Sequence, residues 1–414
     1  MKYYFVGIKG SGMAGLALVY KGLDNDVRGA DVTTSLFTEK KLIENNIQID
    51  SLENMNYEDC DIIVVGNAFL DKYDFQDKKV ITYQQALSSL NDSFYSIAVC
   101  GTHGKTTTTN MIKHILSFFE PINYLVGDGN GHASLKSKYI VYEACEHKDH
   151  FLSYHPNVIV CGNVDYDHVE YFTSKKQYKK SFNQFFNQAK DKLILNDSIS
   201  YKSKKRTSFG LNNNDLKAYN VSFLENGISF SIKHNEKVYD NLFLPFYGKH
   251  MLINSLAAIS CCVYLGHDVL STIKCLQSYK EAGRRYNISF VNSNVIIDDY
   301  GHHPNEILST INAIKQEFPN KELIVVYHPD RPKRLIHFKE GYIKAFSKAK
   351  KAYILPFINT DEEKEKALNL FIINSKTCLL NDSFYNSNYK NTVFLFTGSK
   401  EMKQIIERLI ALLN

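Results

Sequence analysis

Short apolar runs alternate with stretches of helical spacing along the whole chain. Apolar runs of four to eight residues bounded by glycine or polar residues predict buried strands, and strands that alternate with helices predict parallel α/β units. Three groups of this kind follow one another, at residues 1–92, 93–280 and 281–414. The pattern therefore predicts an α/β protein of three domains, each large enough to bury its own core.

The first domain has the opening of a Rossmann-like dinucleotide fold. An apolar run at residues 2–8 leads into a glycine loop and then a helix of small residues, Met13–Lys21. Asp31, about twenty-four residues after Gly7, occupies the position at which an acidic residue binds the ribose in such folds. We expect four loop residues to approach an anionic substrate: Gly10, Ser11, Gly12 and Met13. A tight strand-to-helix turn without a ligand is the alternative.

The central domain begins with a phosphate cradle. A strand at residues 95–100 leads directly into Gly-Thr-His-Gly-Lys-Thr-Thr-Thr-Thr at 101–109, and helical spacing follows at 110–119. Glycines let backbone amides approach an anion, and a helix N-terminus adds a favourable dipole. Lys105 would reach the outer phosphates of ATP and the Thr106 hydroxyl would hold Mg²⁺. The residues expected to bind the nucleotide here are Gly101, Thr102, His103, Gly104, Lys105, Thr106 and Thr107.

The glycine spacing of this cradle is unusual. The standard loop has a glycine where Val99 stands, so the turn is tighter than in ordinary Walker ATPases. A glycine-rich connection with an incidental lysine is the alternative interpretation.

Apolar runs predict the remaining strands. They lie at 61–66 and 80–83 in the first domain, at 139–144, 158–162 and 193–196 in the central domain, and at 295–299, 323–327, 353–357 and 393–396 in the last. Short alternating runs between about 207 and 247 predict a small antiparallel insert, and helical spacing resumes at 251–265. In the last domain, helical segments follow the first, second and fourth strands. The C-terminal domain is therefore predicted to be Rossmann-like as well, behind a central P-loop α/β domain.

Composition narrows the function classes. A net charge of +5 without a basic block suits small anionic substrates and argues against nucleic acid. The eight scattered cysteines have no metal-binding spacing and are expected to be reduced and buried. No apolar run approaches ~18 residues and no signal-like segment opens the chain, so we expect a cytoplasmic protein without membrane insertion. We expect this protein to be a monomer or a weak homodimer.

Polar residues at strand ends and at one helix start are candidates for binding. Glu143 closes a strand and could hold Mg²⁺ opposite Thr106, whereas a solvated acidic loop is the alternative. His168 follows another strand. It could be a neutral metal ligand, a substrate contact or a structural turn residue. Asn254 begins a helix with an amide that could read adenine or simply be solvated.

The C-terminal domain concentrates charge at two successive strand ends. Arg284-Arg285, Asp298–Pro304 and His328–Arg334 carry arginine, histidine and aspartate in close succession. Arginine forks bind phosphate or carboxylate, and Asp299 could accept a hydrogen bond from a ribose hydroxyl. A solvated charged surface is the alternative reading of these segments.

In chain order, the motifs are GIKGSGM, GTHGKTTTT, EACEH, NVDYDH, GKH, RRY and DDYGHHP. Together they resemble those of the Mur ligases of cell-wall synthesis, and within them the branch that joins L-alanine to UDP-N-acetylmuramate with ATP and Mg²⁺. The resemblance covers the whole chain. It implies that the first domain binds the UDP-sugar, the central domain ATP and Mg²⁺, and the last domain the amino acid.

The resemblance also implies roles for single residues. Thr106, Glu143 and His168 would bind the metal, with His168 also near substrate. Asn254 would contact adenine and Asp299 the ribose, and Arg285, Arg331 and Arg334 would contact phosphates. His302 and His303 would lie near the amino acid, and Lys105, His302 and Arg331 would be catalytic.

Several positions depart from the family pattern. Lys9 and Glu281 replace usual glycines, Met251 replaces a common Asn, and the segments His328-Pro329-Asp330 and Gly398-Ser399-Lys400-Glu401 are atypical. Alternatives therefore stay open: a related ligase with another amino acid or a muropeptide substrate, a folylpolyglutamate-type ligase, or a nucleotide-binding homologue with reduced ligase activity. A nicotinamide-dependent oxidoreductase is suggested by the first loop alone.

Overall fold

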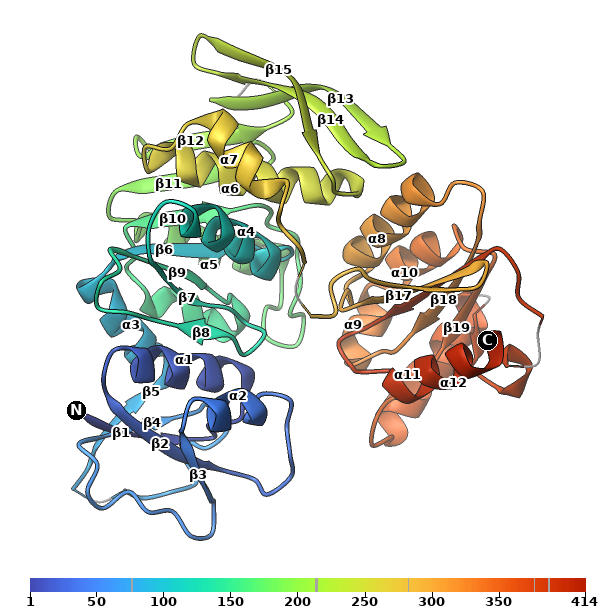
Figure 1. Ribbon diagram of the computed structural model, residues 1–414. Coiled ribbons are helices and arrows are strands. Elements are labelled where there is room, and N and C mark those ends of the chain that lie inside the picture. Colours follow the sequence, from blue (N-terminus) through green and yellow to red (C-terminus); the bar gives the residue numbers. More distant parts are fainter. Residues whose placement is uncertain (76, 213–214, 282, 376, 386–387) are drawn as a thin grey trace.

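The computed structural model describes residues 1–75, 77–212, 215–281, 283–375, 377–385 and 388–414. Its strands form three sheets in succession along the chain, which confirms the predicted three-domain α/β fold with Rossmann-like outer domains. Figure 1 shows the N-terminal and central domains stacked on one side and the C-terminal domain beside them. The exact boundaries at residues 92 and 280 stay predictions.

The N-terminal domain is a parallel sheet in the order β3-β2-β1-β4-β5. All four residues of the interior strand β4 are buried, as its apolar run predicts. The elements are β1 Lys2–Val6, α1 Ser11–Gly22, β2 Asp26–Asp31, α2 Glu39–Glu44, β3 Gln48–Ser51, β4 Ile62–Val65, β5 Lys79–Thr82 and α3 Tyr83–Ser93.

The central sheet has the order β15-β14-β13-β12-β11-β10-β6-β9-β7-β8. Parallel strands form its middle, and the predicted antiparallel insert is confirmed as β13–β15. The strands are β6 Tyr95–Cys100, β7 Ile122–Leu125, β8 Gly131–His132, β9 Tyr139–Glu143, β10 Val158–Cys161, β11 Lys192–Asn196, β12 Arg206–Gly210, β13 Leu216–Leu224, β14 Gly227–His234 and β15 Lys237–Leu244. The helices are α4 Lys105–Ser117, the 3₁₀ helix η1 His147–Ser153, α5 Lys175–Asn187, α6 Gly248–Tyr264 and α7 Val269–Leu276.

The C-terminal sheet has the order β16-β17-β21-β18-β19-β20, and only its β16–β17 pair is antiparallel. Its strands are β16 Asn287–Val291, β17 Asn294–Asp299, β18 Glu322–Tyr327, β19 Lys351–Ile354, β20 Cys378–Leu379 and β21 Thr392–Thr397. Its helices are α8 Pro304–Glu317, α9 Pro332–His337, α10 Lys339–Phe346, α11 Glu362–Ser375, the 3₁₀ helix η2 Asp382–Phe384 and α12 Lys403–Leu413.

The structure corrects several sequence expectations. Helix α4 begins at Lys105, inside the cradle segment, and not at residue 110. A helix, α11, also follows the third C-terminal strand, where none was expected; its first half is almost entirely charged, which hides the apolar spacing. Cys145 is exposed and Cys378 is half-buried, contrary to the expected burial. Cys145 lies just after the end of β9, and Cys378 lies in the edge strand β20, so neither is enclosed by a core. The elements α2, α5, α7, β3, β7, β8, β16 and β20 and the two 3₁₀ helices η1 and η2 were not predicted.

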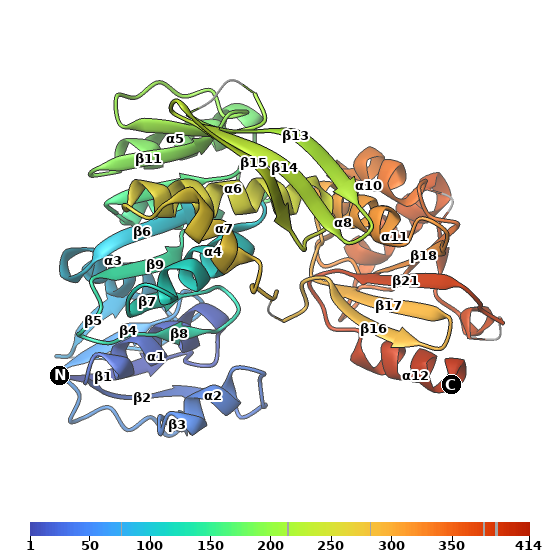
Figure 2. The ribbon, with the colours of Figure 1, turned by 45° about the horizontal axis from the view of Figure 1, so that its top comes forward.

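The N-terminal and central domains share one hydrophobic core. Side chains of α1 and α3 pack in the same cluster as residues of β6, β9 and α5. The C-terminal sheet instead has two cores of its own, one on each face. Figure 2 shows β13–β15 extending over α6 toward α8, where the Gln316 amide donates hydrogen bonds to the Leu224 and Gly227 carbonyls. Across the described residues, we find no helix with the length and apolar character needed to cross a membrane.

Helix α1 rests directly on the backbone of the central domain. A Cβ atom placed on Gly22 would collide with the backbone of Ala133, and one placed on Gly131 would overlap the carbonyl oxygen of Gly15. These glycines let the helix and the β7–β8 hairpin approach more closely than any side chain would permit. The N-terminal domain is therefore held by backbone contact as well as by the shared core.

We predict that Gly131→Ala lowers the free energy of unfolding by about 1–3 kcal/mol, because the methyl group must push α1 away from the hairpin. Urea denaturation followed by circular dichroism measures the change. Gly162→Ala is the matched control, because a Cβ atom there meets nothing within 4 Å. Equal stabilities of the Gly131→Ala variant and the wild type would mean that this contact is looser than described.

Candidate active site between the central and C-terminal domains

A cavity of about 840 Å³ lies between the central and C-terminal domains. Residues predicted separately from the sequence line it from both sides. The central domain contributes His103, Gly104, Thr107 and Asn254, and the C-terminal domain contributes Arg285 and Asp299. The cavity therefore brings the phosphate cradle next to the charged strand ends of the C-terminal sheet.

The cradle is a left-handed turn that opens helix α4. Gly101 and Gly104 have φ angles of 135° and 74°, a region that favours glycine, and Gly104 caps the helix. A Cβ atom on Gly104 would lie 2.5 Å from the Asn254 side-chain oxygen, so only glycine fits beside this amide. The turn leaves backbone amides at a helix N-terminus, which suits an anion such as phosphate.

Lys105 is bound to its own loop and to a buried carboxylate. Its ammonium donates to the carbonyl oxygens of Gly101 at 2.6 Å and Thr102 at 3.1 Å, and to Glu146 at 2.9 Å. Burial alone would lower the pKa of Lys105, but the Glu146 carboxylate holds it above its ordinary value. Lys105 is therefore a fixed positive charge at the cradle, available to phosphate oxygens when they compete with Glu146.

Thr106 and Glu143 form an oxygen pair beside the cradle. Glu143 accepts a hydrogen bond from the Gly127 amide at 2.8 Å; burial raises its pKa, and a hydrogen bond with the Thr106 side chain partly offsets this rise. The Arg285 guanidinium donates to the Thr106 hydroxyl at 3.1 Å. A hydroxyl and a carboxylate are the ligand types that Mg²⁺ accepts together with phosphate and water. These two residues fit the predicted metal role.

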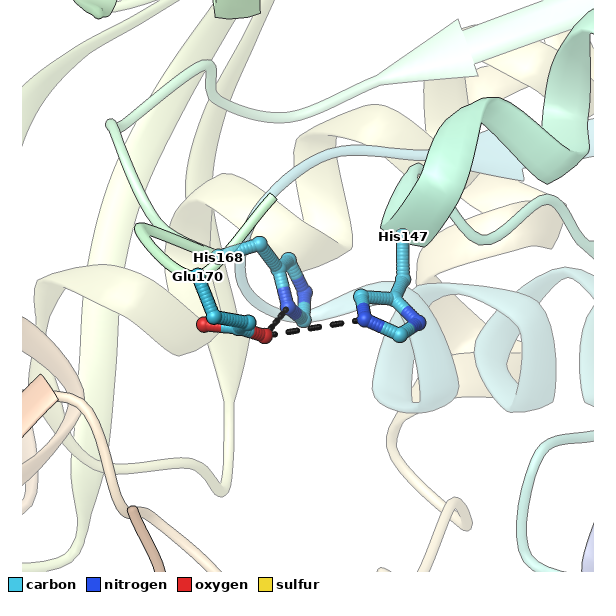
Figure 3. A group of neighbouring side chains, drawn as sticks. All are labelled: His147, His168 and Glu170. Carbon is cyan, nitrogen blue, oxygen red and sulfur yellow. Dashed lines mark hydrogen bonds and ion pairs between the residues drawn. The ribbon is translucent and has the colours of Figure 1, made fainter. Parts of the chain in front are cut away.

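His168, the third predicted metal ligand, has different partners. Its Nε2 atom lies 3.4 Å from Glu146, and its Nδ1 atom lies 3.3 Å from both Glu170 and Arg331. Glu143 is not among the partners described for it. Figure 3 shows His168 instead grouped with His147 and Glu170, the described residues that could together hold a metal ion. Burial, followed by the neighbouring charge of His168, lowers the pKa of His147 to about 4.

A histidine and a glutamate link the two domains across the cavity. The His103 Nδ1 atom lies 3.3 Å from Glu306 at the start of α8, and its ring packs against that of His303 at an interplanar angle of 38°, with centroids 4.6 Å apart. Burial would raise the pKa of Glu306, but His302 and His103 hold it well below its ordinary value. Burial would lower the pKa of His103, but Glu306 and Asp165 raise it. Burial also lowers the pKa of His303 to about 3, so this ring is neutral.

Two of the three arginines predicted to contact phosphates are engaged with carboxylates. Arg334 donates to Asp167 at 3.1 and 3.2 Å and to Asp330 at 3.0 Å, and its side chain is 2% exposed. Arg331 contacts Glu170 and His168. Both arginines thus bind the loop after β10, and their contact with phosphates stays a prediction.

Asp299 and His302 are held by their own domain. Asp299 accepts hydrogen bonds from the Gly301 and Tyr286 amides, each at 3.0 Å, and burial raises its pKa. The His302 carbonyl accepts from the Tyr342 hydroxyl at 2.7 Å, while its ring stays partly exposed. Asp299 lines the cavity with part of its hydrogen-bonding capacity used by its own domain, and its contact with a ribose stays a prediction.

In the first domain, Lys9 completes the glycine loop. The Asp31 carboxylate accepts from the Lys9 amide at 2.6 Å and the Val32 amide at 2.7 Å. The Lys9 ammonium is buried against the Val32 carbonyl at 3.0 Å and Glu39 at 2.7 Å. Asp31 therefore organises the loop itself. Gly10 caps α1, followed by Ser11, Gly12 and the buried Met13, and ligand contact by these residues stays a prediction.

Three family models match the chain in order. The Mur ligase family catalytic domain matches residues 2–95, the Mur ligase middle domain matches 99–262, and the Mur ligase glutamate ligase domain matches 283–377. The chain belongs to the Mur ligase family.

Solved structures agree with this membership at the level of the fold. UDP-N-acetylmuramate-alanine ligase MurC from Thermotoga maritima is 24% identical with a TM-score of 0.82, covering 99% of this chain and 98% of that one. A murein peptide ligase from Psychrobacter arcticus is 19% identical with a TM-score of 0.71, covering 100% and 98%. MurF ligase from Thermotoga maritima, solved with ADP, is 19% identical with a TM-score of 0.67, covering 96% and 98%.

Four carboxylates of this Mur ligase site were not predicted as site residues. Glu146 and Asp167 lie inside motifs already singled out, and Glu170 and Glu306 each lie two residues beyond one. What the sequence does not show is their proximity to Lys105, to the arginines and to His103. Glu281 was noted as a departure from the family pattern. It lines the cavity, and burial raises its pKa to about 7.

We predict that the His103–Glu306 pair stabilises this Mur ligase only within a pH window. A carboxyl group whose folded pKa is lowered contributes stability above its ordinary value of 4.5, and this is lost as the pH falls below that value. A histidine whose folded pKa is raised contributes stability below its ordinary value of 6.5, and this is lost as the pH rises through the folded pKa.

Denaturant unfolding from acid to alkaline pH should therefore show that Glu306→Gln has a free energy of unfolding about 3 kcal/mol lower than that of the wild type near pH 6. The free energy of unfolding of the variant should also change less with pH on the acid and on the alkaline side. Glu322→Gln, which removes an exposed partner of Lys350, is the control and should change little. Parallel pH profiles for wild type and Glu306→Gln would contradict the assignment.

Proposed function

We propose that this Mur ligase joins L-alanine to the carboxylate of UDP-N-acetylmuramate, with conversion of ATP to ADP and phosphate, in the synthesis of peptidoglycan precursors. The cavity carries this proposal, because it sets the phosphate cradle of one domain against Arg285 and Asp299 of the next. The fold likeness to a UDP-N-acetylmuramate-alanine ligase along 99% of the chain supports it.

The chemistry explains why such a reaction uses ATP. A carboxylate is a poor acyl donor, because its oxygen is a poor leaving group. In the proposed reaction a carboxylate oxygen attacks the γ-phosphorus and ADP leaves, which gives an acyl phosphate. The amine of L-alanine then attacks the acyl carbon, and phosphate leaves. Transfer of this kind depends mainly on positioning and on positive charge around the moving phosphoryl group.

The proposed nucleotide contacts follow from the cradle. Amides at the start of α4 and the Lys105 ammonium would bind the phosphates, and Arg285 would add positive charge from the C-terminal domain. Asn254, packed against Gly104, would contact the base. Mg²⁺ bound by Thr106 and Glu143 would neutralise charge on the phosphate oxygens.

The proposed amino-acid site lies at the start of α8. An attacking amine must be neutral, and an α-amino group titrates near ~7.7 to 8, so a modest base is sufficient. His302 has a partly exposed ring there and is our candidate base. His303 is buried and caps α8 with its Nδ1 atom, so its proposed contribution is to shape the site.

We predict that Lys105→Ala lowers the rate of substrate-dependent ADP release by roughly 100-fold or more, because a fixed charge near the phosphates is lost. A coupled ADP assay measures this rate. Lys113→Ala is the matched control, since Lys113 lies on the same helix with its ammonium over the Tyr124 ring. Wild-type phosphate release by the Lys105→Ala enzyme would refute the cradle assignment.

We predict that ADP release requires ATP, UDP-N-acetylmuramate and L-alanine together, and that omission of any one abolishes it. A second candidate is the addition of a preformed muropeptide, favoured by the likeness to a murein peptide ligase over 100% of the chain. The same assay with other single amino acids and with a tripeptide in place of L-alanine distinguishes them. If ADP is released with the tripeptide and with no single amino acid, ATP and UDP-N-acetylmuramate being present in each case, the second candidate replaces our proposal.

A further inference from the structure

The Gln316 side chain, in the last turn of α8, joins two segments of the central domain. Its amide nitrogen donates hydrogen bonds to the carbonyl oxygens of Leu224 at 2.9 Å and Gly227 at 3.0 Å, at the turn between β13 and β14. Its amide oxygen accepts a hydrogen bond from the Gly248 amide at 2.9 Å, at the start of α6. Figure 2 shows the ends of these three elements close together. One side chain of the C-terminal domain therefore commits both donor hydrogens and its acceptor oxygen to the central domain.

The hydrogen bond to Gly248 supplies a cap that α6 lacks in its own domain. The first amides of a helix have no partner within the helix, and a Ser, Thr, Asp or Asn side chain just before it commonly accepts one of them. In α6 the preceding residue is Tyr247, whose side chain makes no capping hydrogen bond. The Gln316 oxygen accepts from the first helical amide instead. Helix α6 is thus capped by a residue 68 positions away, in the neighbouring domain.

The two helices approach each other closely at Gly248. This glycine has a φ angle of 81°, and a Cβ atom there would lie 3.1 Å from the Cβ atom of Ala313 on α8. Ala313 precedes Gln316 by three residues, so both side chains lie on the same face of α8. The glycine of the Gly-Lys-His motif therefore brings α8 near enough for Gln316 to reach the first amide of α6.

The capped end of α6 lies at the cavity between the two domains. Lys249, His250 and Asn254, all in its first two turns, line that cavity. Asn254 also packs against Gly104 of the phosphate cradle. A helix that loses its cap loosens first at this end, because its leading amides are left without partners. The position of these three side chains therefore depends on a hydrogen bond from the other domain.

We propose that Gln316 is a positioning residue for the nucleotide, which makes nucleotide affinity depend on the docking of the C-terminal domain. The inference rests on the proposed function, because it takes Asn254 on α6 as a nucleotide contact. Gln316 lies outside the described lining of the cavity and acts through the cap on α6. The β13–β14 turn also acquires a role. Its two carbonyls hold the amide nitrogen, which leaves the amide oxygen facing Gly248.

Two substitutions in the full-length protein test the cap. Gln316→Met keeps the length of the side chain and removes its amide, and should raise the Kd for ADP roughly five- to tenfold in calorimetry. Gln316→Glu keeps an oxygen for the Gly248 amide, and its charge suits a helix start, so its Kd should stay within about threefold of wild type. The KM for ATP should follow the Kd, while kcat changes by less than about twofold. Gln277→Met is the matched control, since the Gln277 amide donates to the Phe243 carbonyl at 3.1 Å within the central domain.

Hydrogen exchange followed by mass spectrometry adds a readout that needs neither nucleotide nor catalysis. Amides in the first turn of α6 should exchange faster in Gln316→Met than in the wild type and more slowly again in Gln316→Glu, whereas those of α7 should not change. Circular dichroism of each variant shows that the fold is retained.

Unchanged exchange at the start of α6 in Gln316→Met would overturn the cap. Faster exchange there with an unchanged Kd for ADP would overturn its link to the nucleotide, as would a fall in kcat at constant KM. If the wild type itself binds no ADP, the proposed function fails together with that link, while the exchange data still decide whether Gln316 caps α6.

Discussion

The assembly of this site depends on one buried ion pair between domains. Arg334 and Asp167 come from the C-terminal and central domains, and their side chains are 2% and 5% exposed. A buried charge without its partner is strongly destabilising, so this pair holds the two domains in a defined register. It also fixes the loop after β10, which carries Asp165 on one side of Asp167 and His168 on the other. The cavity and the histidine cluster are thus both positioned by the same contact.

Sequence patterns predicted what is local and missed what is distant. The cradle was recognisable because its glycines, lysine and threonines adjoin a strand and a helix in sequence. Helix α5 is local as well, since Tyr178, Phe182 and Phe185 have helical spacing and are buried, although it is not among the predicted helices. The pairing of Arg334 with Asp167 spans 167 residues, and nothing in either segment specifies the other. Glu146 and Arg331, which are distant from His168 in the sequence, could not be predicted as its partners for the same reason.

The residues that depart from the family pattern differ in where their side chains lie and in what they contact. Lys9, where glycine is usual, places its ammonium within its own loop and binds Glu39, so the loop carries an internal counter-ion. Glu281 faces the cavity and hydrogen-bonds with Tyr279 and Thr107 at 3.3 and 3.5 Å. The first change affects the conformation of a loop, whereas the second adds a carboxyl group beside the cradle. For Met251 the structure offers no comparable explanation.

The single core shared by the first two domains divides the molecule differently from its three sheets. Apolar packing is continuous from α1 and α3 into β6, β9 and α5, whereas the C-terminal domain meets its neighbours largely through charged and polar groups. Exposed charged contacts exchange partners for water at small cost, whereas neither the buried Arg334–Asp167 pair nor the continuous core can be opened without exposing an unpaired charge or apolar surface. Mechanically, the N-terminal and central domains therefore form one unit, and the C-terminal domain is attached to it along a seam whose strength depends on charge pairing, and hence on pH, more than on apolar contact.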